Sequence, residues 1–212
     1  ANIAQGTNTI ITTKTGLSLA DYVVTEAGFG ADLGAEKFLH IKGYYSGLKP
    51  AAYVLVATIR ALRYHGGAKK GEYENPNLQA VEKGIENLKK HIENAFKFGL
   101  KPIVAINHFA TDSDEEINFV KSECEKLGVK AILADEFTKG GEGMTELAEE
   151  VVNCAANCEN NFKPLYKVED SVEYKIETIA KEVYGADAVV FSQKALNQLK
   201  SIYNLGLDKL PI

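Results

Sequence analysis

The sequence has no excess of basic residues. It counts 24 lysines and arginines against 29 aspartates and glutamates, which gives a net charge of −5 at pH 7. This balance argues against general binding to nucleic acids or to anionic membrane surfaces. No apolar run approaches the length needed to span a bilayer, and the N-terminus lacks the pattern of a secretory signal peptide. We therefore expect neither nucleic acid nor membrane as a partner.

Cysteine and methionine are scarce. An odd number of cysteines, Cys124, Cys154 and Cys158, indicates free thiols in a reducing compartment, so we predict a cytoplasmic protein. Cys154 and Cys158 are four residues apart with no histidine nearby, which favours two buried or half-buried thiols over a metal site. The first residue is Ala1 and the only methionine is Met144, so we expect a processed chain or a piece of a longer one.

Three catalytic motifs are absent from the 212 residues: G-x-x-x-x-G-K-[ST], G-x-S-x-G and H-E-x-x-H. The first of these builds a phosphate cradle from backbone N–H groups and a lysine, so this chain does not form that cradle by itself.

Apolar runs alternate with amphipathic stretches along the chain, and 45% of the residues are hydrophobic. This alternation predicts an α/β protein with a mainly parallel sheet flanked by helices. The Ala52–Thr58 run is apolar throughout, so we expect both of its faces to be buried. The predicted strands are Tyr22–Thr25, Ala52–Thr58, Pro102–Ile106, Val129–Leu133 and a short one at Ala188–Phe191.

Helix signals fill the intervals. Asn75 and Pro76 are a cap and a first position for a long helix that Gly99 closes. Ser113 and Glu116 have the spacing of a capping box. Ser192 is predicted to cap the last helix.

A glycine loop follows the first predicted strand. Gly28, Gly30 and Gly34 precede a predicted helix, and such a loop lets backbone N–H groups approach an anionic or planar ligand. The spacing is one residue longer than the dinucleotide fingerprint, which disfavours a Rossmann site. Phe29, between two of the glycines, either plugs a core or stacks on a flat ligand, and the spacing alone favours the plug.

Polar and aromatic residues follow the predicted strands, at the edge where ligands of parallel sheets gather. Arg60 meets a phosphate or carboxylate there, or forms an ion pair with an acid such as Glu26. Asn107 reads a base edge or caps a turn. Phe109 and Phe137 clamp a planar ring or, as the default, pack against each other. For the lone histidines His65 and His108 we favour a structural role.

Longer stretches carry a specific resemblance. EAGFGADLGAEKF (Glu26–Phe38) and VATIRALRYHGG (Val56–Gly67) closely resemble signature stretches of formate–tetrahydrofolate ligase, also called formyltetrahydrofolate synthetase. Further stretches follow in the family's order and extend the resemblance over the whole chain: NIAQGTN (Asn2–Asn8), KHIEN (Lys90–Asn94), VAINHFATD (Val104–Asp112), KGGEG (Lys139–Gly143), KIETIAKEVYGAD (Lys175–Asp187) and Leu210-Pro211.

The resemblance implies ATP-dependent joining of formate to tetrahydrofolate, which gives 10-formyltetrahydrofolate, ADP and phosphate, with Mg²⁺ and a monovalent cation as family cofactors. It implies that Phe29, with Gly28 and Gly30, lies on one side of the adenine and Leu133 on the other, with Asn107 close to the base. Phe109 resembles one wall of the pterin pocket.

Two positions depart from the family pattern. Phe137 stands where the family usually has a tryptophan, and Arg63 stands where a lysine is usual. Phenylalanine keeps a flat face but loses area and the indole N–H, so pterin affinity is expected to differ. The chain also lacks the family's phosphate loop and is shorter than family members, which leads us to expect an internal fragment without catalysis of its own.

For the domain organisation, the resemblance implies an incomplete form of the three-layer P-loop NTPase core. Residues 1–98 are expected to be part of the nucleotide-binding α/β core, and residues 99–212 a second α/β lobe that contributes nucleotide and folate pocket walls. The family forms homotetramers, so a homo-oligomer is expected for the full-length enzyme. The competing interpretation is a non-catalytic nucleotide- or folate-binding module, or an assembly subunit.

Overall fold

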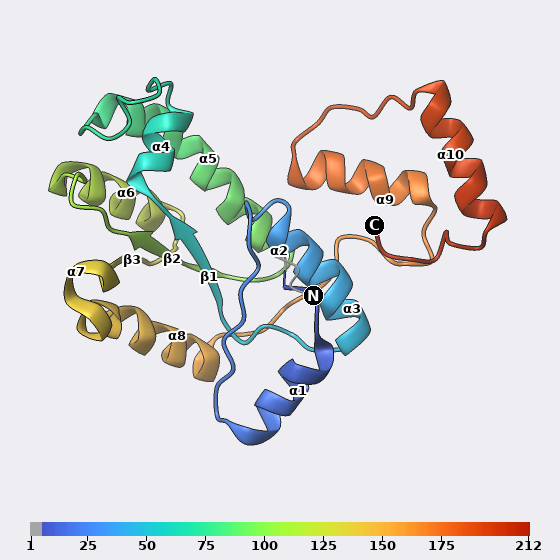
Figure 1. Cartoon of the computed structure of the whole chain (residues 1–212), viewed down its shortest axis with the longest axis horizontal. Coiled ribbons are helices and arrows are strands. Elements are labelled where there is room, and N and C mark those ends of the chain that lie inside the picture. The colour runs from blue at the N-terminus through green and yellow to red at the C-terminus, as the bar shows by residue number, and fades with distance from the viewer. Residues whose placement is uncertain (1–5) are drawn as a thin grey trace. The chain divides into compact units, whose positions relative to one another are not determined.

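The computed structural model describes residues 6–212, which fold into two compact units (Figure 1). The first unit combines the chain up to Lys49 with Lys163–Ile212, and the second is Pro50–Phe162. The domain boundary that the sequence predicts between residues 98 and 99 falls inside the second unit. Of the stretches that resemble the ligase family, Asn2–Asn8 begins outside the described residues.

The second unit contains a parallel sheet. Strands β1 (Tyr53–Ala57), β2 (Pro102–Asn107) and β3 (Ala131–Ala134) lie in the order β1-β2-β3, with Leu55 opposite Val104 and Ile106 opposite Leu133. Parallel strands require crossover connections, and α-helices supply them here. The α/β class and the three central strands predicted from the apolar runs are therefore confirmed.

Helices cover both faces of this sheet. On one face, α5 (Leu78–Lys97) contacts β1 and β2, and α6 (Asp114–Lys126) contacts β3. On the other face lies α8 (Thr145–Asn157), as Figure 1 shows. Its buried Leu147 and Cys154 pack against residues of β2 and β3. The shorter helices of this unit are α4 (Ile59–His65), α7 (Glu136–Lys139) and the 3₁₀ segment η2 (Gly140–Met144).

Side-chain caps mark where α5 and α6 begin. The Ser113 hydroxyl accepts a hydrogen bond from the Glu116 N–H, and the Glu116 carboxylate accepts one from the Ser113 N–H, so the predicted capping box is confirmed. The long helix begins slightly later than predicted. Its cap is Asn77 rather than Asn75, because the Asn77 side chain accepts the Ala80 N–H at 3.1 Å.

The described part of the first unit is helical. Residues 34–46 form a continuous helical stretch built from α2 (Gly34–Lys37), the π-helical turn η1 (Phe38–Lys42) and α3 (Gly43–Ser46). The remaining elements are α1 (Ile10–Leu19), α9 (Val172–Thr178), η3 (Ile179–Val183) and α10 (Gln193–Asn204), the last capped by Ser192 as predicted.

A buried polar cluster joins the two chain segments of this unit. His40 Nδ1 lies 2.7 Å from Glu36 Oε1, and His40 Nε2 accepts the Leu165 N–H at 3.0 Å. The His40 ring stacks on Tyr166 with ring centroids 4.2 Å apart. The residues before Lys49 are thus tied to residues more than a hundred positions later.

Two predicted strands are wrong. Neither Tyr22–Thr25 nor Ala188–Phe191 forms a strand among the described residues, and Val24 and Val190 are each 92% exposed. Their aromatic and β-branched composition fits a pleated surface, but a strand also needs a neighbour to pair with.

The full burial expected for Ala52–Thr58 is also wrong. β1 lies at the edge of the described sheet, and Val54 and Val56 are exposed on the face where α8 covers β2 and β3. No helix within residues 6–212 combines the length and apolarity that membrane spanning requires.

Candidate functional site

The carboxyl ends of β2 and β3 meet at one edge of the sheet. Asn107 is the register partner of Ala134, and the next residue, His108, donates its N–H to the Ala134 carbonyl at 3.0 Å. The two loops that leave these strands therefore start side by side. Phe109 lies on the loop after β2, and Phe137 lies on α7, which begins two residues after β3.

Phe109 is held in a closed turn. The Asp112 N–H donates to the Phe109 carbonyl at 2.9 Å, and the Asp112 carboxylate accepts the Phe109 N–H at 2.9 Å. The phenyl ring is 39% exposed. The turn therefore fixes the backbone of an aromatic residue that remains open to a ligand.

Phe137 lies on α7 and is 95% exposed, so its ring is available for contact. The buried Asp135 just before it anchors this helix. Its carboxylate lies 3.1 Å from His108 Nδ1 and 3.2 Å from Lys139 Nζ, and the hydrogen bond with His108 is the main cause that lowers the pKa of Asp135. A Cβ on Gly143 would lie 2.2 Å from the Asp135 carbonyl oxygen, so the KGGEG turn packs directly against this anchor.

Arg60 follows β1 on the first turn of α4, which the Thr58 side chain caps through the Ala61 N–H at 3.0 Å. Of the two alternatives left open for it, the structure shows the ion pair, and the acid is Glu74. The Arg60 guanidinium also lies 5.2 Å from the centre of the Tyr73 ring. An open cavity of about 390 Å³ adjoins it, lined by Thr58, Arg60, Ala61, Tyr64, Lys70 and Tyr73. Two cationic and two aromatic side chains therefore border a space large enough for a small anion.

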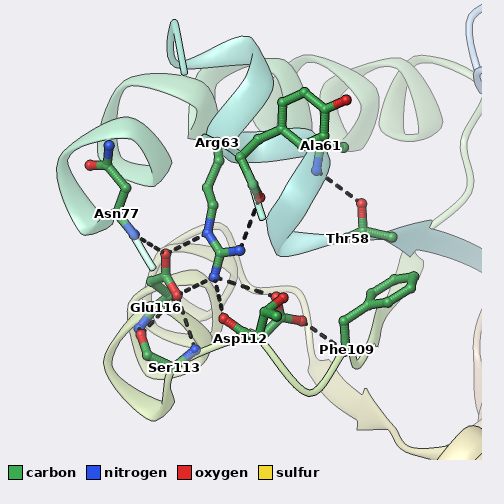
Figure 2. Close-up of polar contacts among 10 residues, drawn as sticks. Thr58, Ala61, Arg63, Asn77, Phe109, Asp112, Ser113 and Glu116 are labelled. Atoms are coloured by element: carbon green, nitrogen blue, oxygen red, sulfur yellow. Dashed lines mark hydrogen bonds and ion pairs between the residues drawn. The ribbon is translucent and has the colours of Figure 1, made fainter. Parts of the chain in front are cut away.

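Arg63 of α4 and Glu116 of α6 form a buried ion pair, which Figure 2 shows. Arg63 donates from Nε and Nη2 to the two Glu116 carboxylate oxygens, at 2.8 and 2.6 Å. Burial by itself would raise the pKa of Glu116, but hydrogen bonds from Arg63, from the Asn77 N–H and from Ser113 outweigh it and lower the pKa to about 2. The sequence pattern identifies Glu116 only as a capping residue.

A signal for this pair was present in the sequence. Arg63 is spaced by four and by one from Ile59 and Leu62, which are the buried apolar residues of α4. That spacing places the guanidinium on the inward face of the helix, where a charge requires a partner.

The glycine loop belongs to the first unit. Phe29 has a φ of 68°, and no other non-glycine residue within the described range has a positive φ. Its side chain is 71% exposed, so the core-plug interpretation is wrong. Gly30 accepts the N–H groups of Leu33 and Gly34, and a Cβ on Gly34 would lie 1.9 Å from the Gly28 carbonyl oxygen.

A bulky residue in the left-handed region is strained, and such strain persists where the surrounding structure imposes it. Here the tight loop that begins at Gly28 presents the Phe29 ring to solvent.

The predicted site residues divide between the two units. Asn107, Phe109, Leu133 and Phe137 lie on or just after the adjacent strands β2 and β3 of the second unit, and Asn107 and Leu133 are half-buried. Phe29, Gly28 and Gly30 lie in the first unit. Arg60 follows β1 in the second unit.

Comparison with protein-family models gives one finding. The model described as formate–tetrahydrofolate ligase matches residues 1–212, the whole of the sequence.

Proposed function

Because the chain belongs to the formate–tetrahydrofolate ligase family, we propose that it takes part in the ATP-dependent joining of formate to tetrahydrofolate. The products are 10-formyltetrahydrofolate, ADP and phosphate. One observation supports the assignment to particular residues: two exposed phenylalanines, Phe109 and Phe137, lie on the segments that leave β2 and β3 side by side.

Phe109 and Phe137 are the proposed pterin walls. A pterin is flat and partly apolar, so aromatic rings bind its faces, and each aromatic pair is worth about 1 kcal/mol beyond the area it buries. A hydrogen bond to the Asp112 carboxylate holds the turn that carries Phe109, and the contact of Asp135 with His108 holds the start of the segment that carries Phe137. Phe137 offers less ring area than a tryptophan, so the affinity for tetrahydrofolate depends more strongly on Phe109.

Nucleotide binding is proposed for two groups of residues. In the first unit, Phe29 stacks on the adenine and the backbone of Gly28 and Gly30 allows close approach. In the second unit, Leu133 supplies apolar contact and the Asn107 amide reads the edge of the base.

Arg60 is the proposed anion-binding residue. A guanidinium suits a carboxylate or a phosphate because its N–H groups bind two oxygens at once. In the structure Glu74 occupies it, so formate or a phosphate group competes with that carboxylate, and Lys70 adds a second positive charge at the same cavity. These cations would stabilise negative charge that develops during transfer of the formyl or phosphoryl group.

Some parts of the reaction receive no residue in this proposal. The 212 residues contain no G-x-x-x-x-G-K-[ST] motif, and within residues 6–212 no group of three or more histidine, cysteine, aspartate or glutamate side chains is placed to hold a metal ion. We therefore assign neither the phosphate cradle nor Mg²⁺ to side chains of this chain.

Calorimetry with tetrahydrofolate and with ATP, combined with an assay for formate-dependent ADP production, tests the proposal. We expect the chain to bind tetrahydrofolate and to produce no ADP when it is alone, since it lacks the phosphate-loop motif. Binding without turnover in a mixture with the remaining parts of a ligase would favour a non-catalytic binding module. No binding of tetrahydrofolate at all would overturn the assignment of the two phenylalanines.

A further inference from the structure

Arg63 is fully buried, and its guanidinium is shared among several partners. The two Glu116 oxygens accept from it in a bidentate pair, as Figure 2 shows, and Glu116 is itself fully buried on α6. Paired N–H donors in a planar fork fix direction as well as distance, which a lysine ammonium does not. The pair therefore sets the position of α4 relative to α6.

The same guanidinium holds the loop of residues 66–77. Arg63 Nη1 donates to the Tyr73 carbonyl at 3.1 Å, and Glu116 accepts the Asn77 N–H at 2.8 Å, so the pair fixes two points of this loop. The loop supplies the Tyr73 ring that lies against Arg60 and the Glu74 carboxylate that pairs with it. The surroundings of the Arg60 cavity thus depend on Arg63.

The Arg63 guanidinium also holds the turn that carries Phe109. Arg63 Nη2 donates to the Thr111 carbonyl at 2.9 Å and lies 3.5 Å from Asp112 Oδ1. That oxygen is buried and accepts no hydrogen bond from the described residues, so the nearby guanidinium balances its charge. The other Asp112 oxygen accepts the Phe109 N–H.

We propose that Arg63 is a positioning residue that holds both loops from one buried guanidinium, the loop beside Arg60 and the turn that carries Phe109. What the two loops bind rests on the proposed function, but the coupling between the loops does not. Arg63 touches neither Arg60 nor Phe109 directly in the contacts described, and acts on them through Tyr73 and Asp112.

The conservative variant Arg63→Lys tests the coupling in the whole chain by hydrogen–deuterium exchange. It keeps the positive charge beside Glu116, whereas an apolar substitution would leave that carboxylate buried without a partner and can prevent folding. Because an ammonium does not reach all the acceptors that the guanidinium does, the amides of Asn77, Phe109 and Asp112 should exchange faster together, on the order of tenfold.

Glu123→Gln is the matched control. Glu123 also lies on α6 and forms an ion pair, with Lys89 of α5 at 2.8 Å, but it is not bonded to either loop. This variant should leave the loop amides as in the wild type. Faster exchange in only one of the two loops, or equal acceleration in both variants, would overturn the coupling.

Calorimetry with tetrahydrofolate separates the two proposals. We expect Arg63→Lys to weaken binding several-fold while Glu123→Gln binds as the wild type does. If the wild type binds tetrahydrofolate and Arg63→Lys binds it equally well, the positioning role is wrong and the proposed function stands. If the wild type binds none, the proposed function fails, and the exchange experiment alone decides the coupling.

Discussion

At the scale of single residues, the chain presents aromatic rings from constrained backbone positions. Phe109 is closed into a turn by Asp112, and Phe29 is held at a positive φ beside two glycines. Neither ring is placed to fill the core of its unit. A constrained and exposed aromatic loses little conformational freedom when a flat ligand stacks on it, which favours binding.

Replacing Phe109 by alanine should weaken tetrahydrofolate binding several-fold while ATP binding changes much less. The lost interaction is a stacking contact worth about 1 kcal/mol together with the ring area. Calorimetry with each ligand measures both effects. Phe96→Ala is the control, since Phe96 is similarly exposed at 42% but lies on α5, away from the strand ends. Loss of ATP affinity with folate affinity intact would reverse the assignment.

Glu116 should give the fold a defined acid sensitivity. Its pKa is lowered from 4.5 to about 2 in the folded chain, so its contribution to stability is complete above pH 4.5 and is lost as the pH falls towards 2. The size of this contribution is about 3 kcal/mol. Urea unfolding of the wild type and of Glu116→Gln across this range measures it.

The variant is needed because burial raises the pKa of the neighbouring Asp112, which acts in the opposite direction. We expect the difference in unfolding free energy between wild type and Glu116→Gln to shrink as the pH falls from 4.5 to 2. A difference that stays constant with pH would show that the carboxylate is not held in its charged form.

At the scale of elements, backbone contact between α4 and α5 brings Arg63 to its partners. A Cβ on Gly84 would lie 1.9 Å from the Leu62 carbonyl oxygen, and a Cβ on Gly66 would lie 1.7 Å from the Ala80 carbonyl oxygen. Both atoms belong to backbone, which does not move aside as a side chain does. Glycine at these two positions is therefore a packing requirement.

Gly84→Ala should destabilise the fold, although alanine is the better helix former. The overpacking cost of about 1–3 kcal/mol exceeds the gain in helix propensity. Chemical denaturation of the wild type and the variant measures the change. Gly141→Ala is the control, since a Cβ there meets open space and its φ is not positive, and it should change stability by less than about 0.5 kcal/mol. If Gly84→Ala were as stable as the wild type, α4 and α5 would be able to move apart to admit the Cβ at no cost in packing.

Elements that neighbouring residues determine could be predicted from the sequence, whereas elements that need a distant partner could not. The Ser113–Glu116 capping box joins residues three apart, and the three central strands are continuous apolar runs, so both could be read from the sequence. Tyr22–Thr25 has strand composition without a strand partner in the described chain, which composition does not reveal.

The candidate site residues were predictable where their cause is local, and not where it depends on contacts between distant parts of the chain. The strand-end positions of Asn107, Phe109 and Phe137 follow from where β2 and β3 end, and those ends were predictable. The pairing of Arg63 with Glu116 joins residues 53 apart, so only the folded chain brings them together. The ion pair of Arg60 with Glu74 likewise depends on the path of the loop after α4.

At the scale of the whole molecule, the chain enters and leaves the second unit at one place within that unit. The Asn160 side chain donates to the Pro50 carbonyl at 2.6 Å, and a Cβ on Gly99 would lie 2.0 Å from the Asn161 carbonyl oxygen. Pro50 and Asn160 therefore lie next to each other. The sheet, the helices that cover it and the Arg63–Glu116 pair all fall between residues 50 and 162.

The first unit is built differently. His40 is buried, and two of its contacts come from the later segment. Its Nε2 accepts the Leu165 N–H, and its ring stacks on Tyr166, whose hydroxyl also accepts the Ile212 N–H at 3.0 Å. Residues 1–49 alone would lose the Leu165 N–H and the Tyr166 ring that contact the buried His40. Because losing a hydrogen bond and the packing around a buried polar side chain is costly, this segment depends on residues 163–212 for its fold.

These two arrangements predict opposite results for isolated segments. Residues 50–162 expressed alone should fold, with a helical and β-type circular dichroism spectrum and one cooperative transition in urea, because their core and chain ends are complete within the segment. Residues 1–49 alone should show no cooperative transition, and adding residues 163–212 as a separate peptide should restore one. A non-cooperative transition for residues 50–162, with strong binding of a hydrophobic dye, would mean that this core needs the first unit for its packing.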